Sequence, residues 1–189
     1  RSDYYGDTRF HIPFIAWYQV MNASLALTTM EVLKDRIPVT MEQLQAGIAN
    51  TRWQGRMETI LPGVIVDGAH NEDGVRRFVE TAERFQKEYP LTLLFSAVND
   101  KDYQDMIHTI CSRIKFRKVV TTEVGGYREV PSAELAEIFC KEGCKEVGNS
   151  DNIEEAFHMA HEAKGEDGML FCVGSLYLVG EIKTLLLKK

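Results

Sequence analysis

Residues 64–71 read Val-Ile-Val-Asp-Gly-Ala-His-Asn, an apolar strand that runs directly into small and polar residues at the start of a helix. In an open α/β sheet, ligands bind where strands end and helices begin, because free backbone N–H groups and short side chains converge there. Asp67, His70 and Asn71 occupy such a position. The stretch therefore predicts a ligand site at the edge of a sheet.

A structural role explains part of the same stretch. Asn71 suits the N-cap of the following helix, and the two acidic residues after it suit the positive end of the helix dipole. Neither argument accounts for Asp67 and His70 together at the end of a strand. From this chemistry alone, a structural and a functional role remain open for both residues.

Apolar strands alternate with amphipathic helices from residue 57 onwards. The predicted strands are 57–61, 64–67, 91–97, 117–122, 145–148 and 169–173. The predicted helices are 72–88, 102–115, 132–142, 152–164 and 175–187. Strands 91–97 and 169–173 are rich in apolar residues, as central parallel strands covered on both faces should be. The pattern predicts a Rossmann-like, doubly wound and mostly parallel α/β sheet.

Residues 1–50 lack this alternation and contain two predicted helices. The first spans 19–34, and the second begins with a capping box formed by Thr40 and Gln43 and ends near Asn50. The first dozen residues are expected to be frayed, because a chain terminus is poorly ordered unless it docks on a domain.

The connection 50–56 is the predicted domain boundary, which divides the chain into segments 1–50 and 51–189. With 189 residues and 44% apolar content, the chain can bury one sizeable core plus a short appendage. The longer segment is therefore expected to hold the core.

Charge and composition exclude several classes of protein. The net charge is −6, from 22 basic and 28 acidic residues, and no dense Lys/Arg stripe occurs, so nucleic acid is not an expected partner. No apolar run approaches the roughly 20 residues that cross a bilayer, so no membrane partner is expected either. The four cysteines are too few and too scattered for a disulfide scaffold, with Cys111 and Cys172 on predicted buried faces. These features predict a reduced, cytoplasmic protein, and we expect a monomer.

No metal or nicotinamide site is predicted. Cys140 and Cys144 could share an ion, and so could His158 and His161, but no further ligand completes either pair. The Gly-x-Gly-x-x-Gly loop of nicotinamide-binding proteins follows none of the predicted strands. The glycine pair at 125–126 is interpreted as a flexible turn.

Three further motifs accompany Asp-Gly-Ala-His-Asn at 67–71 in a specific order along the chain. They are Tyr-Gln-Val-Met-Asn-Ala-Ser-Leu-Ala-Leu at 18–27, Gln-Gly-Arg-Met-Glu at 54–58 and Phe-Cys-Val-Gly-Ser-Leu-Tyr at 171–177. In this order and spacing they resemble the folylpolyglutamate synthase/dihydrofolate synthase family of the Mur ligase superfamily. The resemblance implies a C-terminal ligase domain, preceded by a short helical remnant of the central ATPase domain.

The resemblance also implies a missing part. Family members bind nucleotide phosphates on a Gly-rich loop ending in Gly-Lys-Ser/Thr, and no Gly-Lys pair occurs in this chain. The chain begins at Arg1 and not at a methionine. We therefore expect a C-terminal fragment, inactive alone, whose partner is the N-terminal P-loop domain of the same protein.

The chemistry implied by the resemblance is an ATP-dependent amide ligation. ATP, with Mg²⁺ held by the missing part, converts the carboxylate of a folate or dihydropteroate into an acyl phosphate. The amine of L-glutamate then attacks, which releases phosphate and leaves an amide.

The family's functional residues map onto six positions of this chain. By resemblance, Asn22 reads adenine with support from Gln19, and Asp67 accepts hydrogen bonds from the ribose. Arg56 contacts the terminal phosphate and is one of two catalytic candidates, since a guanidinium is always charged and its donors are fixed. Alternatively, Arg56 has only a structural role, in an ion pair with Glu58.

The remaining candidates concern the incoming amino acid. His70, the second catalytic candidate, is assigned to glutamate binding together with Asn71 and Ser175. Ser175 is otherwise a good N-cap for the last helix. Lys101, in a charged loop at the same edge, could add positive potential or simply be solvated.

Two other kinds of protein stay open as alternatives. One is the C-terminal domain of another Mur-type amide ligase, from peptidoglycan or cyanophycin synthesis. The other is a binding domain without catalysis, which would have no P-loop domain encoded upstream.

Overall fold

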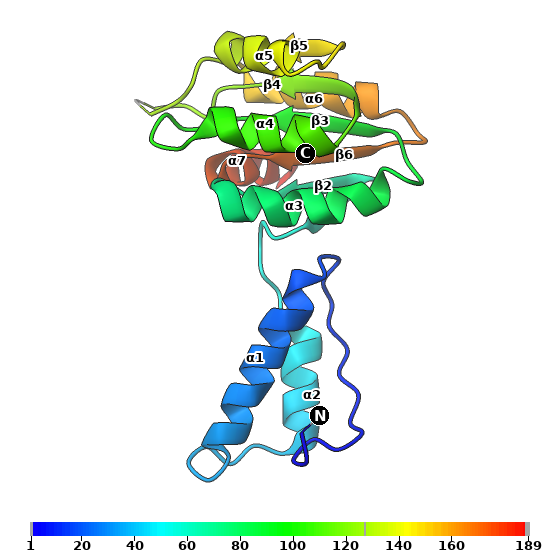
Figure 1. Cartoon of the computed structure of the whole chain (residues 1–189), viewed down its shortest axis with the longest axis vertical. Helices are drawn as coiled ribbons and strands as arrows, with labels where there is room; N and C mark the ends of the chain where they lie inside the picture. The colour runs from blue at the N-terminus through cyan, green and yellow to red at the C-terminus, as the bar shows by residue number, and fades with distance from the viewer. Residues whose placement is uncertain (1, 127, 188–189) are drawn as a thin grey trace. The chain divides into compact units, whose positions relative to one another are not determined.

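The computed structural model describes residues 2–126 and 128–187, which form two units divided between Gln54 and Gly55. The first unit holds α1 (Tyr18–Leu33) and α2 (Met41–Asn50), and the second holds every strand (Figure 1). No helix among the described residues combines the length and the apolar character needed to cross a bilayer.

Hydrogen bonds within the first unit hold its start in place. The hydroxyl of Tyr5 donates to the Leu27 carbonyl at 2.6 Å, and Ser2 Oγ donates to Glu31 at 2.8 Å. The expectation of a frayed start is therefore wrong for residues 2–12, because side-chain contacts with α1, which leave no periodic pattern in the sequence, anchor them. Arg1 lies outside the described residues. The predicted capping box at the start of α2 is confirmed, with Thr40 and Gln43 bonded reciprocally.

A six-stranded sheet forms the centre of the second unit, in the order β1-β2-β6-β3-β4-β5. The strands are β1 (Glu58–Leu61), β2 (Val64–Asp67), β3 (Leu91–Phe95), β4 (Phe116–Thr121), β5 (Val147–Asn149) and β6 (Met169–Val173). Only β1 runs antiparallel, and its pairing with β2 carries a register shift between Thr59 and Leu61. The predicted doubly wound, mostly parallel sheet is confirmed, and β3 and β6 take the two central positions, as their apolar sequences indicated.

Helices cover both faces of this sheet (Figure 1). They are α3 (Glu72–Phe85), α4 (Tyr103–Arg113), α5 (Ser132–Lys141), α6 (Ile153–Lys164) and α7 (Leu176–Leu187). α3, α4 and α5 pack on one face, while α6 and α7 share a buried apolar cluster with strand residues on the other. Because parallel strands need right-handed crossovers, the return from β5 to β6 places α6 opposite the first three helices.

Aromatic side chains fill the face beneath α3 and α5. Phe171 on β6 packs edge to face against Phe78 and Phe85 of α3, with ring centroids 5.5 and 5.7 Å apart. Phe95 on β3 meets Phe139 of α5 in the same way at 5.3 Å. Edge-to-face pairs of this kind add stability beyond the burial of apolar area.

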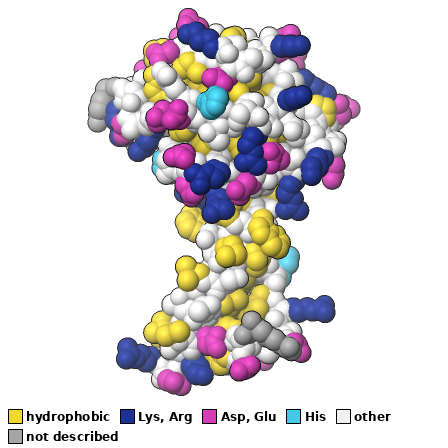
Figure 2. Space-filling model, in the orientation of Figure 1, with side chains coloured by type: hydrophobic (Ala, Val, Ile, Leu, Met, Phe, Trp, Pro, Cys, Tyr) yellow, Lys and Arg dark blue, Asp and Glu magenta, His cyan; other side chains and the backbone are white. Residues whose placement is uncertain are grey.

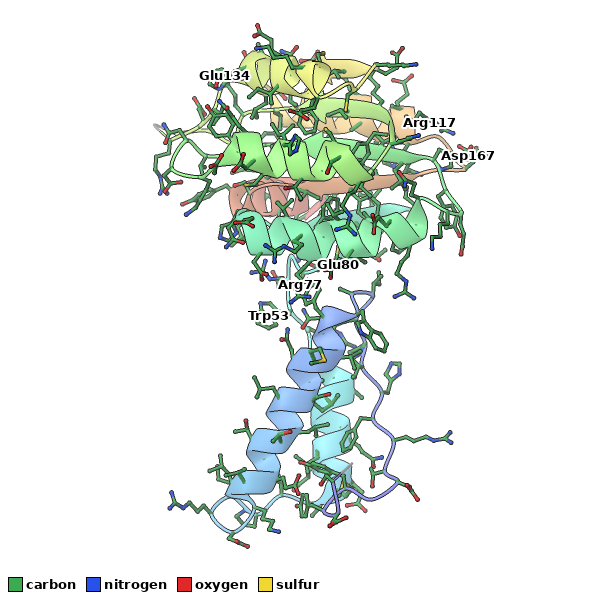
Figure 3. The ribbon with its side chains drawn as sticks, in the orientation of Figure 1. Trp53, Arg77, Glu80, Arg117, Glu134 and Asp167 are labelled. Atoms are coloured by element: carbon green, nitrogen blue, oxygen red, sulfur yellow. The ribbon has the colours of Figure 1, made fainter. Side chains whose placement is uncertain are left out.

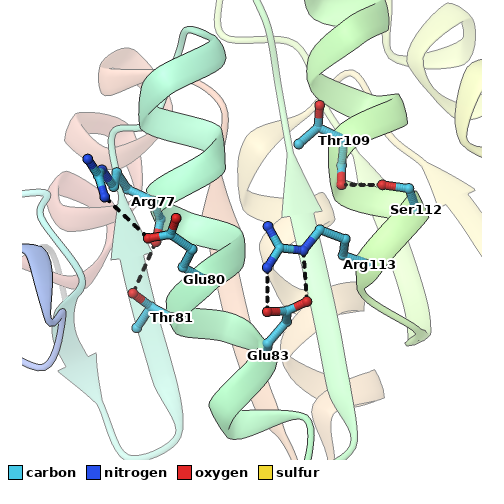
Figure 4. Close-up of polar contacts among 7 residues, drawn as sticks. All are labelled: Arg77, Glu80, Thr81, Glu83, Thr109, Ser112 and Arg113. Carbon is cyan, nitrogen blue, oxygen red and sulfur yellow. Dashed lines mark hydrogen bonds and ion pairs between the residues drawn. The ribbon is translucent and has the colours of Figure 1, made fainter.

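Ion pairs join the outer ends of neighbouring elements. Arg113 of α4 donates two hydrogen bonds to Glu83 of α3, at 2.8 and 2.6 Å (Figure 4). Arg117 of β4 and Asp167 point toward one another and form a second bidentate pair (Figure 3). These pairs are partly exposed, so their contribution to stability is small. On the face shown in Figure 2, acidic and basic side chains are interspersed over this unit.

Truncating Phe171 tests this packing. The side chain is fully buried, so Phe171→Ala is expected to lower the free energy of unfolding by about 3–5 kcal/mol through lost burial and a residual cavity. Phe171→Leu keeps most of the volume and is expected to cost less than about 1.5 kcal/mol. Urea unfolding of both variants checks the prediction, and equal losses would contradict it.

Candidate functional site at the carboxyl edge of the sheet

The carboxyl ends of β2 and β6 lie side by side, and the helices that follow these two strands pack on opposite faces of the sheet. Asp67, the last residue of β2, pairs in register with Val173, the last residue of β6. From there α3 continues on one face of the sheet and α7 on the other (Figure 1). Open α/β sheets bind ligands at such switch points. The structure therefore gathers Asp67, His70, Asn71 and Ser175 at one edge.

Asp67 lies at the centre of this edge and is only 3% exposed. Its Oδ1 accepts a hydrogen bond from the Ala69 N–H and its Oδ2 accepts one from the Met57 N–H, both at 2.8 Å. Burial raises the pKa of Asp67 to about 6, and the two backbone donors, Arg56 and His70 oppose that rise. The carboxylate thus links the end of β2 to the segment that precedes β1.

That segment, residues 55–57, has an unusual backbone. Gly55 and Met57 both have left-handed conformations, with φ of 65° and 46°, and Met57 carries a side chain that disfavours it. The Met57 side chain is buried, and the Gly55 carbonyl accepts a hydrogen bond from the Gly68 N–H at 2.7 Å. Burial and hydrogen bonds therefore hold the segment against the sheet edge.

Arg56 extends from this segment toward the start of the β2–α3 loop. Its Nη1 donates to the Gly55 carbonyl at 3.3 Å and lies 2.9 Å from where a Cβ on Gly68 would stand. The same Cβ would overlap Leu176, so only glycine fits between the two side chains. Glu58 is the ion-pair partner expected for Arg56 if that arginine has only a structural role. The two carboxylate oxygens of Glu58 accept hydrogen bonds from Lys183 Nζ at 2.8 and 3.0 Å.

His70 follows in the same loop, partly exposed. Its Nδ1 lies 2.7 Å from the Gly68 carbonyl oxygen. Because a carbonyl only accepts hydrogen bonds, Nδ1 carries the proton, and Nε2 of the neutral ring is left as an acceptor. The ring is thus oriented to take a proton or an N–H donor at Nε2.

Asn71 and Ser175 both cap helices. Asn71 Oδ1 accepts from the Gly74 N–H at 2.8 Å, and Ser175 Oγ accepts from the Tyr177 N–H at 3.1 Å. Asn71 is exposed, whereas Ser175 is 2% exposed. Their structural roles are confirmed, and their assignment to glutamate binding stays a prediction.

Gln19 and Asn22 lie together in the first unit. Asn22 Nδ2 donates to Gln19 Oε1 at 2.8 Å, and both line a pocket of about 160 Å³. Its apolar wall is formed by Ile12, Phe14, Ala23, Ala26, Ile48 and Trp53. Gln19 is 3% exposed, and its Nε2 has no hydrogen-bond partner within residues 2–126 and 128–187. An apolar pocket with one unsatisfied donor is suited to a flat ligand that carries an acceptor.

Arg128 is a candidate that sequence reasoning missed. Gly125 and Gly126 have positive φ angles of 75° and 109°, which agree with the turn expected at this glycine pair. After this turn, Arg128 lies 3.0 Å from Asp100 and 3.1 Å from the Tyr177 hydroxyl, at the carboxyl edge. No motif marks this arginine, because the pairing between its loop and the one after β3 is a long-range contact.

The other residues weighed from the sequence have ordinary surroundings. His158 lies 3.9 Å from Glu154, one turn away on α6. α5 ends at Lys141, between Cys140 and Cys144, as expected. Across residues 2–126 and 128–187, no three His, Cys, Asp or Glu side chains are arranged to hold a metal ion.

This fold and sheet edge are shared with a family of ligase domains. The chain belongs to the Mur ligase family, since the family model described as "Mur ligase, glutamate ligase domain" matches residues 55–176. Among curated relatives, the dihydrofolate synthase/folylpolyglutamate synthase of Bacillus subtilis is 31% identical in an alignment 179 residues long, which covers 89% of this chain and 39% of that protein. The chain thus spans about two fifths of the length of this relative.

Solved structures agree with this family. Folylpolyglutamate synthase of Mycobacterium tuberculosis, complexed with ADP and AMPPCP, superposes with a TM-score of 0.79 at 26% identity, covering 93% of this chain and 41% of that one. Folylpolyglutamate synthase of Thermotoga maritima gives a TM-score of 0.71, also at 26% identity, with 90% and 39% covered.

The buried carboxylate predicts a specific pH dependence. The folded-state pKa of Asp67, about 6, lies above the ordinary value of 3.8, so the folded protein binds the proton more tightly than the unfolded chain. The contribution of this group to stability is full below about pH 4 and is lost as the pH rises through 6. Between pH 4 and 7, wild type should lose about 2–3 kcal/mol of unfolding free energy relative to Asp67→Asn.

Two measurements check this prediction. Urea unfolding of both proteins across that pH range gives the difference directly. The ¹³C resonance of the Asp67 carboxyl should titrate near pH 6, and a midpoint below about 4 would contradict the assigned burial.

Proposed function

We propose that this chain is the C-terminal part of an ATP-dependent folylpolyglutamate synthase, which adds glutamate to a folate through an acyl phosphate. Membership of the Mur ligase family and the names of the relatives support the proposal. Segment 1–50 is then the end of the central ATPase domain, and segment 51–189 is the glutamate ligase domain.

The observation that carries the proposal is the pocket around Gln19 and Asn22. A cavity of about 150 Å³ can accommodate a benzene ring, so one of about 160 Å³ suits a single flat heterocycle. The Asn22 carboxamide both donates and accepts, and Gln19 offers an unsatisfied donor. Adenine carries ring acceptors and an exocyclic donor, which match this pair.

The second unit holds the two other residues that the resemblance assigns to the nucleotide in the longer enzyme. Asp67 is ionised above its pKa of about 6 and accepts hydroxyl hydrogen bonds from the ribose. Arg56 stabilises the terminal phosphate, where negative charge redistributes during transfer. Mg²⁺ neutralises phosphate charge in phosphoryl transfer, and we assign its ligands to the part of the enzyme outside this chain.

Amide formation then requires a nucleophilic amine. ATP phosphorylates the folate carboxylate, and the glutamate nitrogen attacks the resulting acyl carbon, which expels phosphate. His70 Nε2, the free acceptor of the ring, takes the proton that the amine loses. In this proposal Asn71 and Ser175 hold the glutamate, through the Asn71 Nδ2 and the Ser175 hydroxyl proton that their capping bonds leave available.

The exposed face of α1 supports the assignment of a further domain. Trp17 precedes the helix, and Met21, Leu25 and Val32 follow it along one face, each between 66% and 77% exposed. Apolar stripes at this spacing are normally buried. We infer that the P-loop domain of the longer enzyme covers this stripe.

Removing Arg56 tests the proposed phosphate contact in the longer enzyme. Phosphate release that depends on ATP, Mg²⁺, a reduced folate and glutamate should fall by about 10²–10³-fold in kcat for Arg56→Ala. Its unfolding free energy should change by less than about 1 kcal/mol, because no core packing is lost.

Arg117→Ala is the matched control, since Arg117 lies at the opposite edge of the sheet and pairs with Asp167. Its turnover should equal that of wild type. Phosphate release that requires an amino acid other than glutamate, or a peptidoglycan precursor, would favour the sister ligases, and no ATP turnover would favour a binding domain.

Replacing Gln19 separates a ligand contact from a structural defect. Gln19→Leu removes a buried Nε2 that has no partner, but it also removes the acceptor of the Asn22 hydrogen bond, so the stability of the protein should change by no more than about 1 kcal/mol. If the amide contacts adenine, affinity for ATP measured by calorimetry should nevertheless fall about tenfold. Gln45→Leu, in the same unit, should leave the affinity unchanged. Equal affinities of Gln19→Leu and wild type would refute the adenine contact.

A further inference from the structure

Two of the four cysteines lie side by side in the second unit. Cys111 on α4 and Cys144, which follows α5, have their sulfur atoms 3.6 Å apart, although 33 positions separate them in the chain. Both are partly buried, whereas Cys140 is exposed and Cys172 is fully buried in the cluster under α6 and α7. The sequence drew attention to Cys140 with Cys144, but the structure pairs Cys144 with Cys111.

We propose that Cys111 and Cys144 form a reversible disulfide that joins α4 to the α5–β5 connection. A disulfide needs its sulfurs about 2.0 Å apart, so they must approach by roughly 1.5 Å. Side-chain rotation and a small shift of one segment supply this movement. Cys144 lies in a turn, after Gly143 with φ of 92° and with its N–H bonded to the Phe139 carbonyl, and not within a helix.

The surroundings assign different roles to the two thiols. The hydrogen bond between them lowers the pKa of Cys144 and raises that of Cys111, so Cys144 loses its proton more readily than Cys111. The carboxylate of Glu142 opposes ionisation at both sulfurs, and His108 lies 2.9 Å from that carboxylate on its exposed side. Cys144 therefore acts first and Cys111 second.

A small disulfide such as oxidised glutathione completes the reaction. The Cys144 thiolate attacks one of its sulfurs, breaks the S–S bond and releases one glutathione thiolate. Cys111, after losing its proton to water, attacks the Cys144 sulfur of the mixed disulfide and releases the second thiolate. Two electrons pass to the oxidant, and the two protons lost by the protein are taken up by the two leaving thiolates.

The bond would close a covalent ring that contains several elements of the fold. The residues between Cys111 and Cys144 include β4, the loop with Arg128, and α5. Closing a ring of this size restricts the unfolded chain, which should raise the melting temperature by about 5–10 °C. This inference concerns oxidation of the domain and does not depend on the proposed ligase activity.

The test equilibrates the folded chain in glutathione buffers poised at about −180 mV and maps its peptides by mass spectrometry. A Cys111–Cys144 linkage, a higher melting temperature and reversal by dithiothreitol are expected. Cys140→Ser should behave like wild type, whereas Cys111→Ala and Cys144→Ala should show neither linkage nor shift. Free thiols at this potential, glutathione adducts alone, or a Cys140–Cys144 linkage would overturn the proposal.

Discussion

A buried carboxylate holds the carboxyl edge of the sheet together. Two backbone hydrogen bonds, one from the loop of Asp67 itself and one from Met57, offset part of the cost of removing this carboxylate from water. The Met57 bond fixes a left-handed residue that would otherwise relax, and Arg56 is its immediate neighbour. Asp67 thus bonds to the residue after Arg56 and to the residue before His70.

The residues at this edge divide into those that cap helices and those that we propose to act on the ligand. Asn71 and Ser175 use one oxygen each to cap a helix, which fixes both loops at the switch point. His70 is oriented through Nδ1 and presents Nε2, while the absence of a side chain on Gly68 makes room for the Arg56 guanidinium. Groups held in place before a ligand arrives lose little entropy when it binds, which favours a site that acts on charged reactants.

The sequence was most informative where structure is local. Hydrophobic periodicity located all six strands, and cap residues such as Thr40 and Asn71 marked helix starts, because these signals arise within a few residues. Long-range contacts left no such signal. The anchoring of the N-terminal segment by Tyr5, the approach of Arg128 and the pairing of Cys111 with Cys144 each depend on segments that meet only in the folded chain.

The two outer strands of the sheet bear on how this domain behaves in a crowded solution. β5 has only three residues, and β1 is short, irregular in its pairing and tied by Glu58 to Lys183 of the last helix. Long, regular outer strands invite neighbouring molecules to add strands of their own, which is a common route to aggregates. Short and irregular edge strands offer no such template, so this domain can reach high concentrations without strand pairing between molecules.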